Sequence, residues 1–217
     1  MSLEIRRLAN PSDEELDAIA NVAAAAFRDD STNACLGGNW DLAFPFWRAL
    51  VGAQNAGGEN VVAIIDGKVV GHAGWFPPGH ELLDTPQQAE AGLNEFVARL
   101  TPDMVRWYFE YFLPKMKEGA EEAYGKGVSK SIWHLQTLCV APEYQGRGIG
   151  HKLVQAKEEE ILATQGDGAM CLESTAAENT NMYKRWGFVE KGKSHIESSV
   201  VSFDGWFLYK DVKSSPK

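Results

Sequence analysis

The apolar positions of this chain change their spacing along its length, and each spacing predicts an element. Residues 3–8 alternate between apolar and polar, the pattern of a half-buried strand. After Pro11-Ser12-Asp13, a typical helix start, apolar side chains recur at helical spacing up to Phe27. A second helical pattern covers residues 41–53. The first quarter of the chain is therefore predicted to hold one strand and two helices.

A β-hairpin is predicted next. Two runs rich in β-branched residues, 61–65 and 68–70, stand on either side of Asp66-Gly67. This dipeptide suits the two left-handed positions of a type I′ turn. The second strand should continue as far as Pro77-Pro78. Residues 81–130 then follow a mostly helical pattern of apolar positions.

Strands and helices are predicted to alternate in the remainder of the chain. In chain order they are strand 131–140, helix 148–164, strand 169–173, helix 179–186, and strands 188–189 and 197–203, with a turn at Asp204-Gly205 that leads into residues 206–209. Residues 131–140 are apolar on both faces near their end, as expected of a central strand covered on both sides. Gly187 follows the second helix in the position of a C-cap.

Composition and charge narrow the class of protein. At 217 residues the chain is long enough for one well-filled α/β domain and short for two. Its net charge of −9 opposes binding to nucleic acid or to anionic membranes. No apolar run approaches the length of a transmembrane helix and no signal-peptide pattern follows Met1, so a cytoplasmic protein is expected. Cys35, Cys139 and Cys171 are scattered and lack CxxC spacing, which indicates neither a disulfide framework nor a metal site.

The segment from Leu138 to Gly150 carries the most specific chemical signal. A buried strand breaks at Pro142, and a glycine-dense turn, Gln-Gly-Arg-Gly-Ile-Gly, leads into a helix. Such a turn leaves N–H groups unpaired at a helix N-terminus, where they can bind a phosphate or a diphosphate. Because His151 follows Gly150, the Lys-Ser/Thr ending of a Walker loop is missing. The glycine spacing also differs from that of a dinucleotide-binding fingerprint.

This segment closely resembles the acetyl-CoA-binding motif of the GCN5-related N-acetyltransferases. The glycine loop of that family is written Gln/Arg-x-x-Gly-x-Gly/Ala, and its fixed positions are filled by Gln145, Gly148 and Gly150. A second family signature, Asn…Tyr-x-x-x-Gly-Phe, falls where the first predicts it. Its fixed positions are filled by Asn179, Tyr183, Gly187 and Phe188. The resemblance is specific between residues 135 and 188 and only topological before residue 131.

The resemblance implies the fold of the family over a single domain, residues 1–217. That fold is of the α/β (α+β) class, with a mixed, mostly antiparallel central sheet flanked by helices and with splayed central strands. Residues 81–130 form a longer helical insertion than the family usually has at this point. This insertion could shape the substrate pocket or simply widen the core, and the sequence does not decide between the two.

The resemblance also implies an acetyl-CoA-dependent N-acetyltransferase, an acyltransferase that acts on a primary amine of a small molecule or peptide by direct attack in a ternary complex. The thioester would lie between diverging strands at 135–140 and 169–173. The residues implied in binding acetyl-CoA are Leu138, Cys139, Val140, Gln145, Gly146, Arg147, Gly148, Ile149, Gly150, His151, Asn179 and Tyr183. No nucleic-acid or membrane partner is expected, and the enzyme would be a monomer or homodimer.

Three residues are candidates for proton transfer. By the resemblance, the phenol of Tyr183 would give a proton to the leaving thiolate. The attacking amine must lose a proton, and Glu173 and His134 are the candidates to accept it, with a path through solvent as a third possibility. Histidine has the suitable unperturbed pKa, whereas glutamate would need burial to raise its pKa, or a relaying water.

Other interpretations compete with this one. Cys139 could carry the acetyl group in two half-reactions, although its place on a buried strand favours a packing role. The chain could also be a CoA-binding sensor or interaction module without turnover, or could transfer a longer acyl chain or act on a hydroxyl. The many aromatic residues outside the motifs are expected mainly to pack the core. If some line the acceptor side, the first candidate is the segment Trp75-Phe76-Pro77-Pro78, since it leads from the hairpin toward the expected acceptor end.

Overall fold

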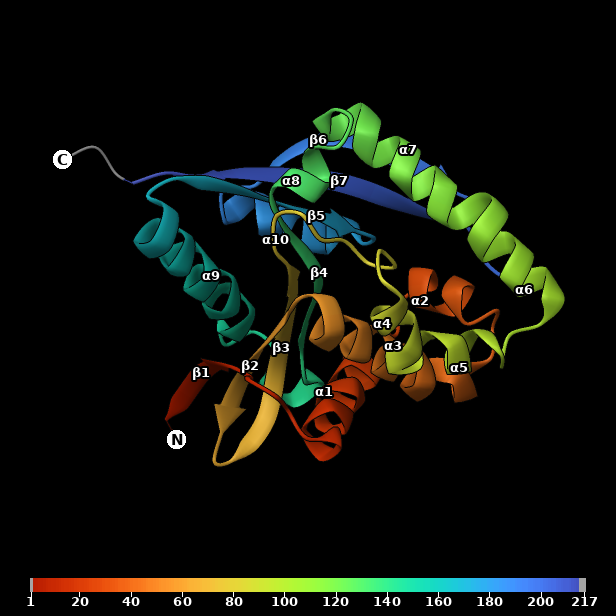
Figure 1. The fold of residues 1–217 in the computed structure, drawn as a ribbon, viewed down its shortest axis with the longest axis horizontal. Coiled ribbons are helices and arrows are strands. Elements are labelled where there is room, and N and C mark those ends of the chain that lie inside the picture. The colour runs from red at the N-terminus through yellow and green to blue at the C-terminus, as the bar shows by residue number, and fades with distance from the viewer. Residues whose placement is uncertain (1, 215–217) are drawn as a thin grey trace.

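A seven-stranded sheet with helices on both faces forms the centre of the computed structural model, which describes residues 2–214 (Figure 1). The strand order is β1-β2-β3-β4-β5-β7-β6. The strands are β1 (Leu3–Arg7), β2 (Glu59–Ile65), β3 (Lys68–Phe76), β4 (Trp133–Val140), β5 (Gly168–Ser174), β6 (Val189–Ile196) and β7 (Phe203–Val212). Every neighbouring pair is antiparallel except β4 with β5. This mixed, mostly antiparallel sheet confirms the predicted fold class.

The helices before the hairpin start at well-defined caps. They are α1 (Asp13–Ala26), α2 (Asp30–Cys35), a 3-10 turn η1 (Trp40–Leu42) and α3 (Ala43–Gly57). Helix α1 begins as predicted because Ser12 and Glu15 form a capping box, with N–H to side-chain oxygen distances of 3.3 and 3.0 Å. Helix α2 was not predicted, since its six residues show no apolar periodicity. It depends on the carboxylate of Asp29, which accepts the N–H of Thr32 at 2.8 Å.

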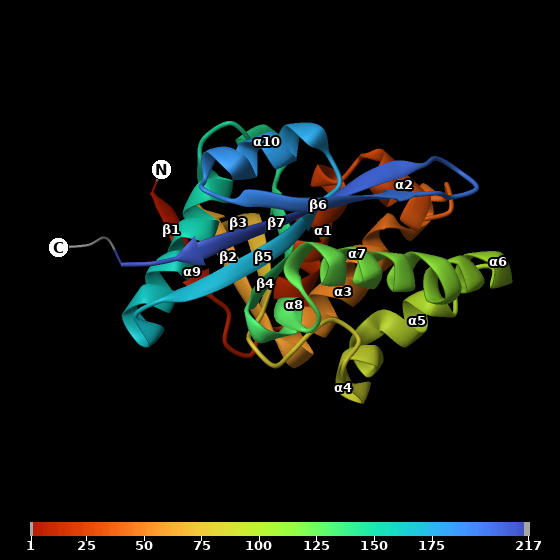
Figure 2. The ribbon, with the colours of Figure 1, turned by 90° about the horizontal axis from the view of Figure 1, so that it is seen from above.

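The insertion is helical, as predicted, but it is broken into short pieces. These are α4 (Pro86–Gln88), a π-helical turn η2 (Ala89–Leu93), α5 (Asn94–Val97), α6 (Pro102–Arg106), a second π-helical turn η3 (Trp107–Phe112), α7 (Leu113–Tyr124) and α8 (Val128–Ser131). The backbone bends at Gly92, whose φ of 130° is not helical, and Pro102 starts a new helix. Helix α7 lies along β6 and β7 on the face opposite the later helix α10 (Ala177–Arg185) (Figure 2).

The two hairpins differ in how well the sequence predicted them. Asp66 and Gly67 have φ angles of 50° and 76°, which confirms the type I′ turn between β2 and β3. The predicted strand at 197–203 and the turn at Asp204-Gly205 are wrong: residues 197–202 are the loop, and Asp204-Gly205 lies inside β7. The reason is cross-strand pairing, because the Asp204 carboxylate lies 2.7 Å from the ammonium of Lys193 and 2.9 Å from Nδ1 of His195 on β6.

A bulge in β4 separates the two halves of the sheet. Trp75 and Gly74, neighbours on β3, face Leu135 and Thr137 on β4, so Gln136 has no partner on β3. On its other side, β4 pairs with β5 only at residues 133–135, opposite 170–172. Beyond the bulge the two parallel strands diverge, which confirms the splay implied by the family resemblance.

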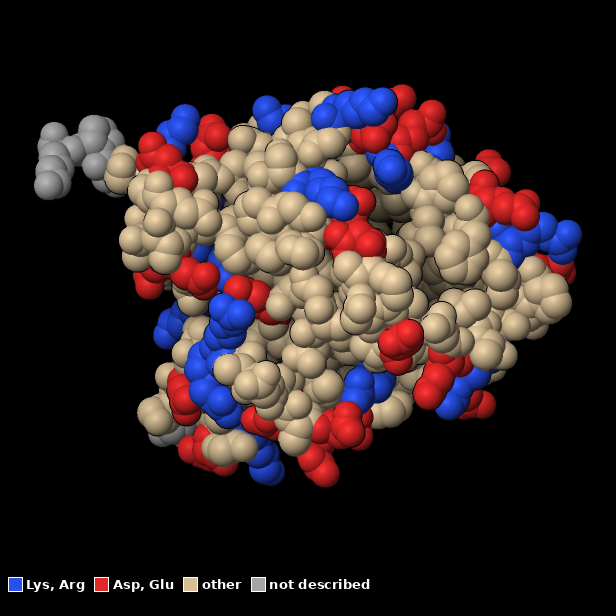
Figure 3. Space-filling view, in the orientation of Figure 1, with Lys and Arg blue, Asp and Glu red and all other residues tan. Residues whose placement is uncertain are grey.

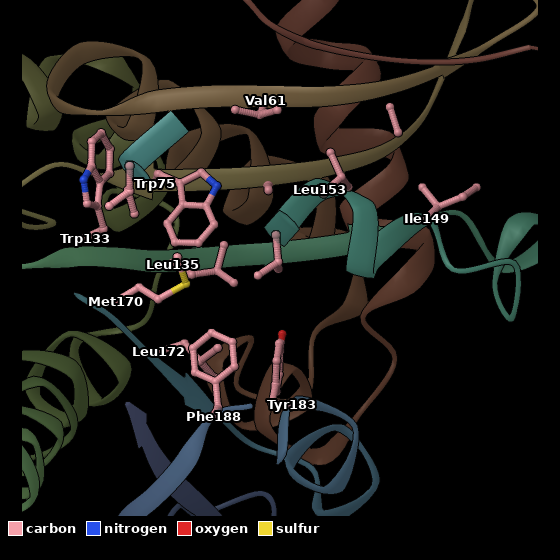
Figure 4. Close-up of a cluster of buried hydrophobic side chains, with 14 of the residues drawn as sticks. Val61, Trp75, Trp133, Leu135, Ile149, Leu153, Met170, Leu172, Tyr183 and Phe188 are labelled. Atoms are coloured by element: carbon pink, nitrogen blue, oxygen red, sulfur yellow. The ribbon is translucent and has the colours of Figure 1, made fainter. Parts of the chain in front are cut away.

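The largest apolar core lies between the sheet and α9 (Ile149–Gln165), and α1 and α3 cover the opposite face (Figures 1 and 4). Trp75 belongs to this core, and Trp75 and Phe76 are both 0 % exposed. Trp75 and Phe76 therefore pack in the core, as expected for most of the aromatic residues, and do not line an acceptor pocket, because the end of β3 is covered on both faces. No helix within residues 2–214 is long and apolar enough to cross a bilayer.

A buried lysine on α9 provides a test of the packing. The ammonium of Lys157, 1 % exposed, lies 2.6 Å from Oε2 of Glu59, 2.8 Å from Oε2 of Glu160 and 4.0 Å from the centre of the Trp133 ring. Lys157→Ala would remove the closer of the two cations of Glu59, since Arg7 remains at 2.9 Å, together with the buried stem of the lysine. We expect the free energy of unfolding to fall by about 3 kcal/mol.

Chemical denaturation checks this expectation. The matched control is Lys115→Ala, which removes a partly exposed lysine that lies 3.0 Å from Glu118 on α7, and it should leave the midpoint of the transition unchanged. Equal midpoints for the two variants would show that the buried cation contributes nothing to stability.

Candidate active site

A cavity of about 680 Å³ lies where β4 and β5 diverge. Its walls come from both strands, from α2 and α3, from the insertion and from α10. Figure 3 shows the surface hollowed between the region of α7 and that of α4 and α5. Five of the residues implied in catalysis or acetyl-CoA binding line this one cavity: His134, Leu138, Glu173, Asn179 and Tyr183. The strand that leads into the glycine loop and the Asn179–Tyr183 motif therefore border the same cavity.

The glycine loop lies outside this cavity, at the exposed N-terminus of α9. Gly146 and Gly148 have φ angles of 72° and 76°, a left-handed conformation that favours glycine. A Cβ atom added to either residue would meet no atom within 4 Å. No acceptor within residues 2–214 takes a hydrogen bond from the N–H groups of residues 146–151. The loop thus presents a row of free donors beside an empty space, as an anion-binding site requires.

Side chains of the loop mostly hold the loop itself. The Gln145 side chain donates from Nε2 to the Val140 carbonyl at 3.0 Å, and Arg147 donates from Nη2 to the Glu143 carbonyl at 2.8 Å. Ile149, 3 % exposed, packs its side chain into the core. A ligand at the loop could therefore contact only the backbone of Ile149.

His151 and Cys139 have different surroundings. The His151 ring stacks on Trp186 with ring centres 5.0 Å apart, next to the free N–H groups of the loop. Cys139 is 4 % exposed and packs against α1 and α3 rather than lining the cavity. Burial raises the pKa of its thiol to about 12. Such a thiol is not ionised near neutral pH and is a poor nucleophile.

Tyr183 points an uncommitted hydroxyl into the cavity. Its ring, 8 % exposed, is held by edge-on contacts with Trp186 and Phe188 at centre distances of 5.4 and 5.7 Å. Figure 4 shows the hydroxyl directed toward β4. No hydrogen bond to this hydroxyl is found within residues 2–214. Burial raises the pKa of Tyr183 well above its usual value, so the phenol keeps its proton at neutral pH.

The two candidate bases form one pair. Nε2 of His134 on β4 lies 2.6 Å from Oε2 of Glu173 on β5, and the side chains are 14 % and 17 % exposed. Burial by itself lowers the pKa of His134, but the charge of Glu173 and its hydrogen bond outweigh burial and hold that pKa above its usual value. An ionised carboxylate can only accept a hydrogen bond, so Nε2 carries the proton and Nδ1 of a neutral His134 keeps its lone pair.

The sequence did not reveal the apolar wall of the cavity. The apolar and aromatic residues that form it come from α3 and above all from the insertion: Phe46, Leu50, Leu82, Leu93, Phe96, Val97, Leu100, Tyr108, Phe109, Phe112, Leu113 and Met116. The insertion therefore shapes the pocket. The available signal was the run Trp107-Tyr108-Phe109-Glu110-Tyr111-Phe112, which places aromatic rings on every side of a helix and so cannot bury all of them in one core.

Comparisons with known proteins agree with this geometry. The sequence profile of the family described as "Acetyltransferase (GNAT) domain" matches residues 84–203, more than half of the 217 residues. Among solved structures, arylalkylamine N-acetyltransferase 2 from Aedes aegypti is similar with a TM-score of 0.64 at 14 % identity, over 98 % of this chain and 100 % of that chain. No curated protein sequence gives a match.

Two further solved structures share the fold. Mosquito arylalkylamine N-acetyltransferase-like 5b has a TM-score of 0.63 at 16 % identity, over 97 % of this chain and 100 % of that chain. The ribosomal-protein-S18-alanine N-acetyltransferase of Escherichia coli has a TM-score of 0.57 at 14 % identity, over 100 % of this chain and 97 % of that chain. At sequence identities this low, the similarity to these structures shows a shared fold.

Proposed function

The chain belongs to the GNAT family of acetyltransferases, and from this premise we propose that it transfers the acetyl group of acetyl-CoA to a primary amine by direct attack in a ternary complex. One observation carries the proposal. The cavity between β4 and β5 is lined both by the phenol of Tyr183 and by the hydrogen-bonded pair of His134 and Glu173. These are the proton donor and the proton acceptor that such a transfer needs.

The glycine loop fits the diphosphate of acetyl-CoA. Free N–H groups at 146–151 and the empty space beside Gly146 and Gly148 provide a seat for an anion. The chain carries a net charge of −9, so an anionic ligand has to be held by this local geometry rather than by the field of the whole protein. Arg147, His151 and Lys152 add positive or ionisable groups next to the loop. Leu138 and Asn179, which line the cavity, would border the arm that leads to the thioester.

Acetyl-CoA, when bound, supplies the thioester carbonyl carbon. The amine nitrogen forms a bond to this carbon, and the bond between the carbon and sulfur breaks. His134 takes one proton from the amine nitrogen at Nδ1, and Glu173 holds the ring and stabilises its positive charge through Nε2. Tyr183 gives its proton to the departing sulfur. The main-chain N–H of Leu138 or Val140, beyond the bulge, would stabilise the negative charge that develops on the carbonyl oxygen.

By their names, the structural relatives acetylate acceptors of two kinds, arylalkylamines and an alanine of a ribosomal protein. All are amines, which supports an amine acceptor for this chain.

An acyl-cysteine route is not part of the proposal. Because the Cys139 thiol is buried outside the cavity and its pKa is raised to about 12, we expect Cys139→Ala to keep kcat within about twofold of the parent value. Steady-state kinetics check this, and mass spectrometry of protein incubated with acetyl-CoA should show no acetyl adduct on Cys139. A covalent adduct that disappears in the variant together with activity would establish the two-step route instead.

Calorimetry and turnover together test the proposed function. Acetyl-CoA should bind with saturable heat, and CoA release should be detected with at least one member of a panel of small and peptide amines. Tight binding without release of CoA above the rate of buffer hydrolysis, for every amine, would assign the chain to the sensors rather than to the enzymes.

A further inference from the structure

We propose that the acceptor is a primary amine carried on an aromatic or bulky apolar body, an inference that rests on the acetyl transfer proposed above. The cavity has two different ends. Glu173 on β5 and Asp29 before α2 line it on one side, and the rings of α3 and the insertion line it on the other, where Glu81 and Glu121 also border it. A molecule that fills both ends has a cationic amine at one side and little polarity at the other.

The ring-lined end is a fixed array. Phe96 and Tyr108 meet edge to face with centres 6.4 Å apart, and Tyr108 and Phe112 do the same at 5.8 Å. The Tyr108 hydroxyl donates to the Cys35 carbonyl at 2.6 Å, so its proton is not available to a ligand. The π-helical turn Trp107–Phe112 brings Tyr108, Phe109 and Phe112 to the same cavity. This wall favours an apolar or aromatic group over a hydrated one.

The other end is suited to a cation. Glu173 lines it, and Asp29 at the start of α2 lines it as well. Asp29 is held near the end of β5, because the Ser31 hydroxyl lies 2.7 Å from its carboxylate and 2.8 Å from the hydroxyl of Thr175, two residues after Glu173. This arrangement attracts an ammonium group to the place where His134 can take its proton.

The lysines that border the cavity do not offset these carboxylates. Lys130 is engaged by Glu81 and Asp84, each at 3.4 Å. Lys117 and Lys126 are exposed at the rim, where water screens their charge.

Two exposed apolar side chains extend the wall to the surface. Phe109 is 49 % exposed and Leu83 is 40 % exposed, and both border the cavity. Phe44 is 38 % exposed but does not border it. The pair Phe109 and Phe44 therefore allows a comparison of two similarly exposed phenylalanines, one inside the proposed site and one outside.

The experiment measures kcat/KM by CoA release for three acceptors: 2-phenylethylamine, ethanolamine and the peptide Ala-Gly-Gly. We expect the kcat/KM for 2-phenylethylamine to exceed that for each of the other two acceptors by about 100-fold. Burial of a ring in a fitted apolar pocket stabilises the bound acceptor by an amount that corresponds to a difference of this size. Phe109→Ser should lower the ratio of the kcat/KM for 2-phenylethylamine to that for ethanolamine by about tenfold. Phe44→Ser should leave both values unchanged.

The outcomes separate this inference from the proposed function. Ethanolamine or the peptide acetylated as efficiently as 2-phenylethylamine would overturn the acceptor class while leaving acetyl transfer intact. An unchanged ratio in Phe109→Ser, or an equal drop in Phe44→Ser, would also overturn it. Failure of all three amines, together with no heat on addition of acetyl-CoA, would overturn the proposed function and this inference with it.

Discussion

Replacement of Tyr183 by phenylalanine is expected to lower kcat by about 10²- to 10⁴-fold while leaving the affinity for CoA unchanged. The variant removes only the hydroxyl, which bonds to no group within residues 2–214, and keeps the ring contacts with Trp186 and Phe188. The packing of the ring and the binding of CoA should therefore be unchanged, and the variant should lack only the proton donor for the departing sulfur. Steady-state turnover and calorimetric titration with CoA measure the two quantities.

Tyr209→Phe is the matched control. Tyr209 on β7 bonds to Asp211 at 3.1 Å and does not line the cavity, so its loss should change neither quantity. Near-normal turnover in Tyr183→Phe would remove Tyr183 from the mechanism. An equal loss of CoA affinity and turnover would instead assign it to binding.

The second large effect is expected in the pH dependence of kcat/KM. His134 must be neutral to accept a proton, so activity should rise as pH rises through its pKa, which the Glu173 carboxylate raises. In Glu173→Gln that charge is gone and burial, which lowers the pKa, remains; the rising limb should therefore move to lower pH. The maximum should also fall, since the imidazolium formed in the reaction loses its partner. His134→Ala should abolish the limb and lower kcat/KM by about 10²-fold or more.

His195→Ala provides the control for this experiment. His195 also pairs with a carboxylate, Asp204, at 2.9 Å, but on the exposed face of β6 and β7 and outside the cavity. Its removal should leave the profile unchanged. If Glu173→Gln abolishes the limb while His134→Ala retains it, Glu173 is the base and His134 only its partner.

The predictable part of this site is local in sequence. Gln145, Gly148 and Gly150 have to follow one another at fixed spacing because the turn, its left-handed glycines and the helix N-terminus form one continuous segment. The same is true of Asn179 and Tyr183, which lie four positions apart on one face of α10. The hairpin at Asp66-Gly67 was predictable for the same reason, since its turn requires positive φ angles at two adjacent residues.

The remainder depends on contacts between distant segments. Glu173 and His134 were separate candidates in the sequence, and only the pairing of β4 with β5 brings them to 2.6 Å. The bulge at Gln136 could not be predicted, because a strand that is apolar on both faces shows no change of pattern where one residue is inserted. The turn of the last hairpin lies before the predicted position, because Asp204 pairs with Lys193 and His195 on β6. A short stretch of sequence does not reveal such cross-strand partners.

The pocket wall was the least predictable feature. Phe96, Tyr108 and Phe112 follow the same helical spacing that a core would show. Whether such rings face a core or a cavity is decided by how the short helices bend at Gly92 and Pro102, and by what lies opposite them. That arrangement is a property of the packed molecule rather than of any one segment.

Calorimetric titration of CoA into the parent protein, Gly148→Ala and Gly67→Ala tests most directly whether the backbone of the glycine loop holds the diphosphate. Both glycines have a φ of 76°, and a Cβ at either meets no atom within 4 Å, so the two variants carry the same backbone strain. We expect the parent and Gly67→Ala to bind CoA equally and Gly148→Ala to bind at least about tenfold more weakly, because its methyl group enters the space of the anion. Equal affinity in Gly148→Ala and Gly67→Ala, or no measurable binding by the parent, would contradict the account.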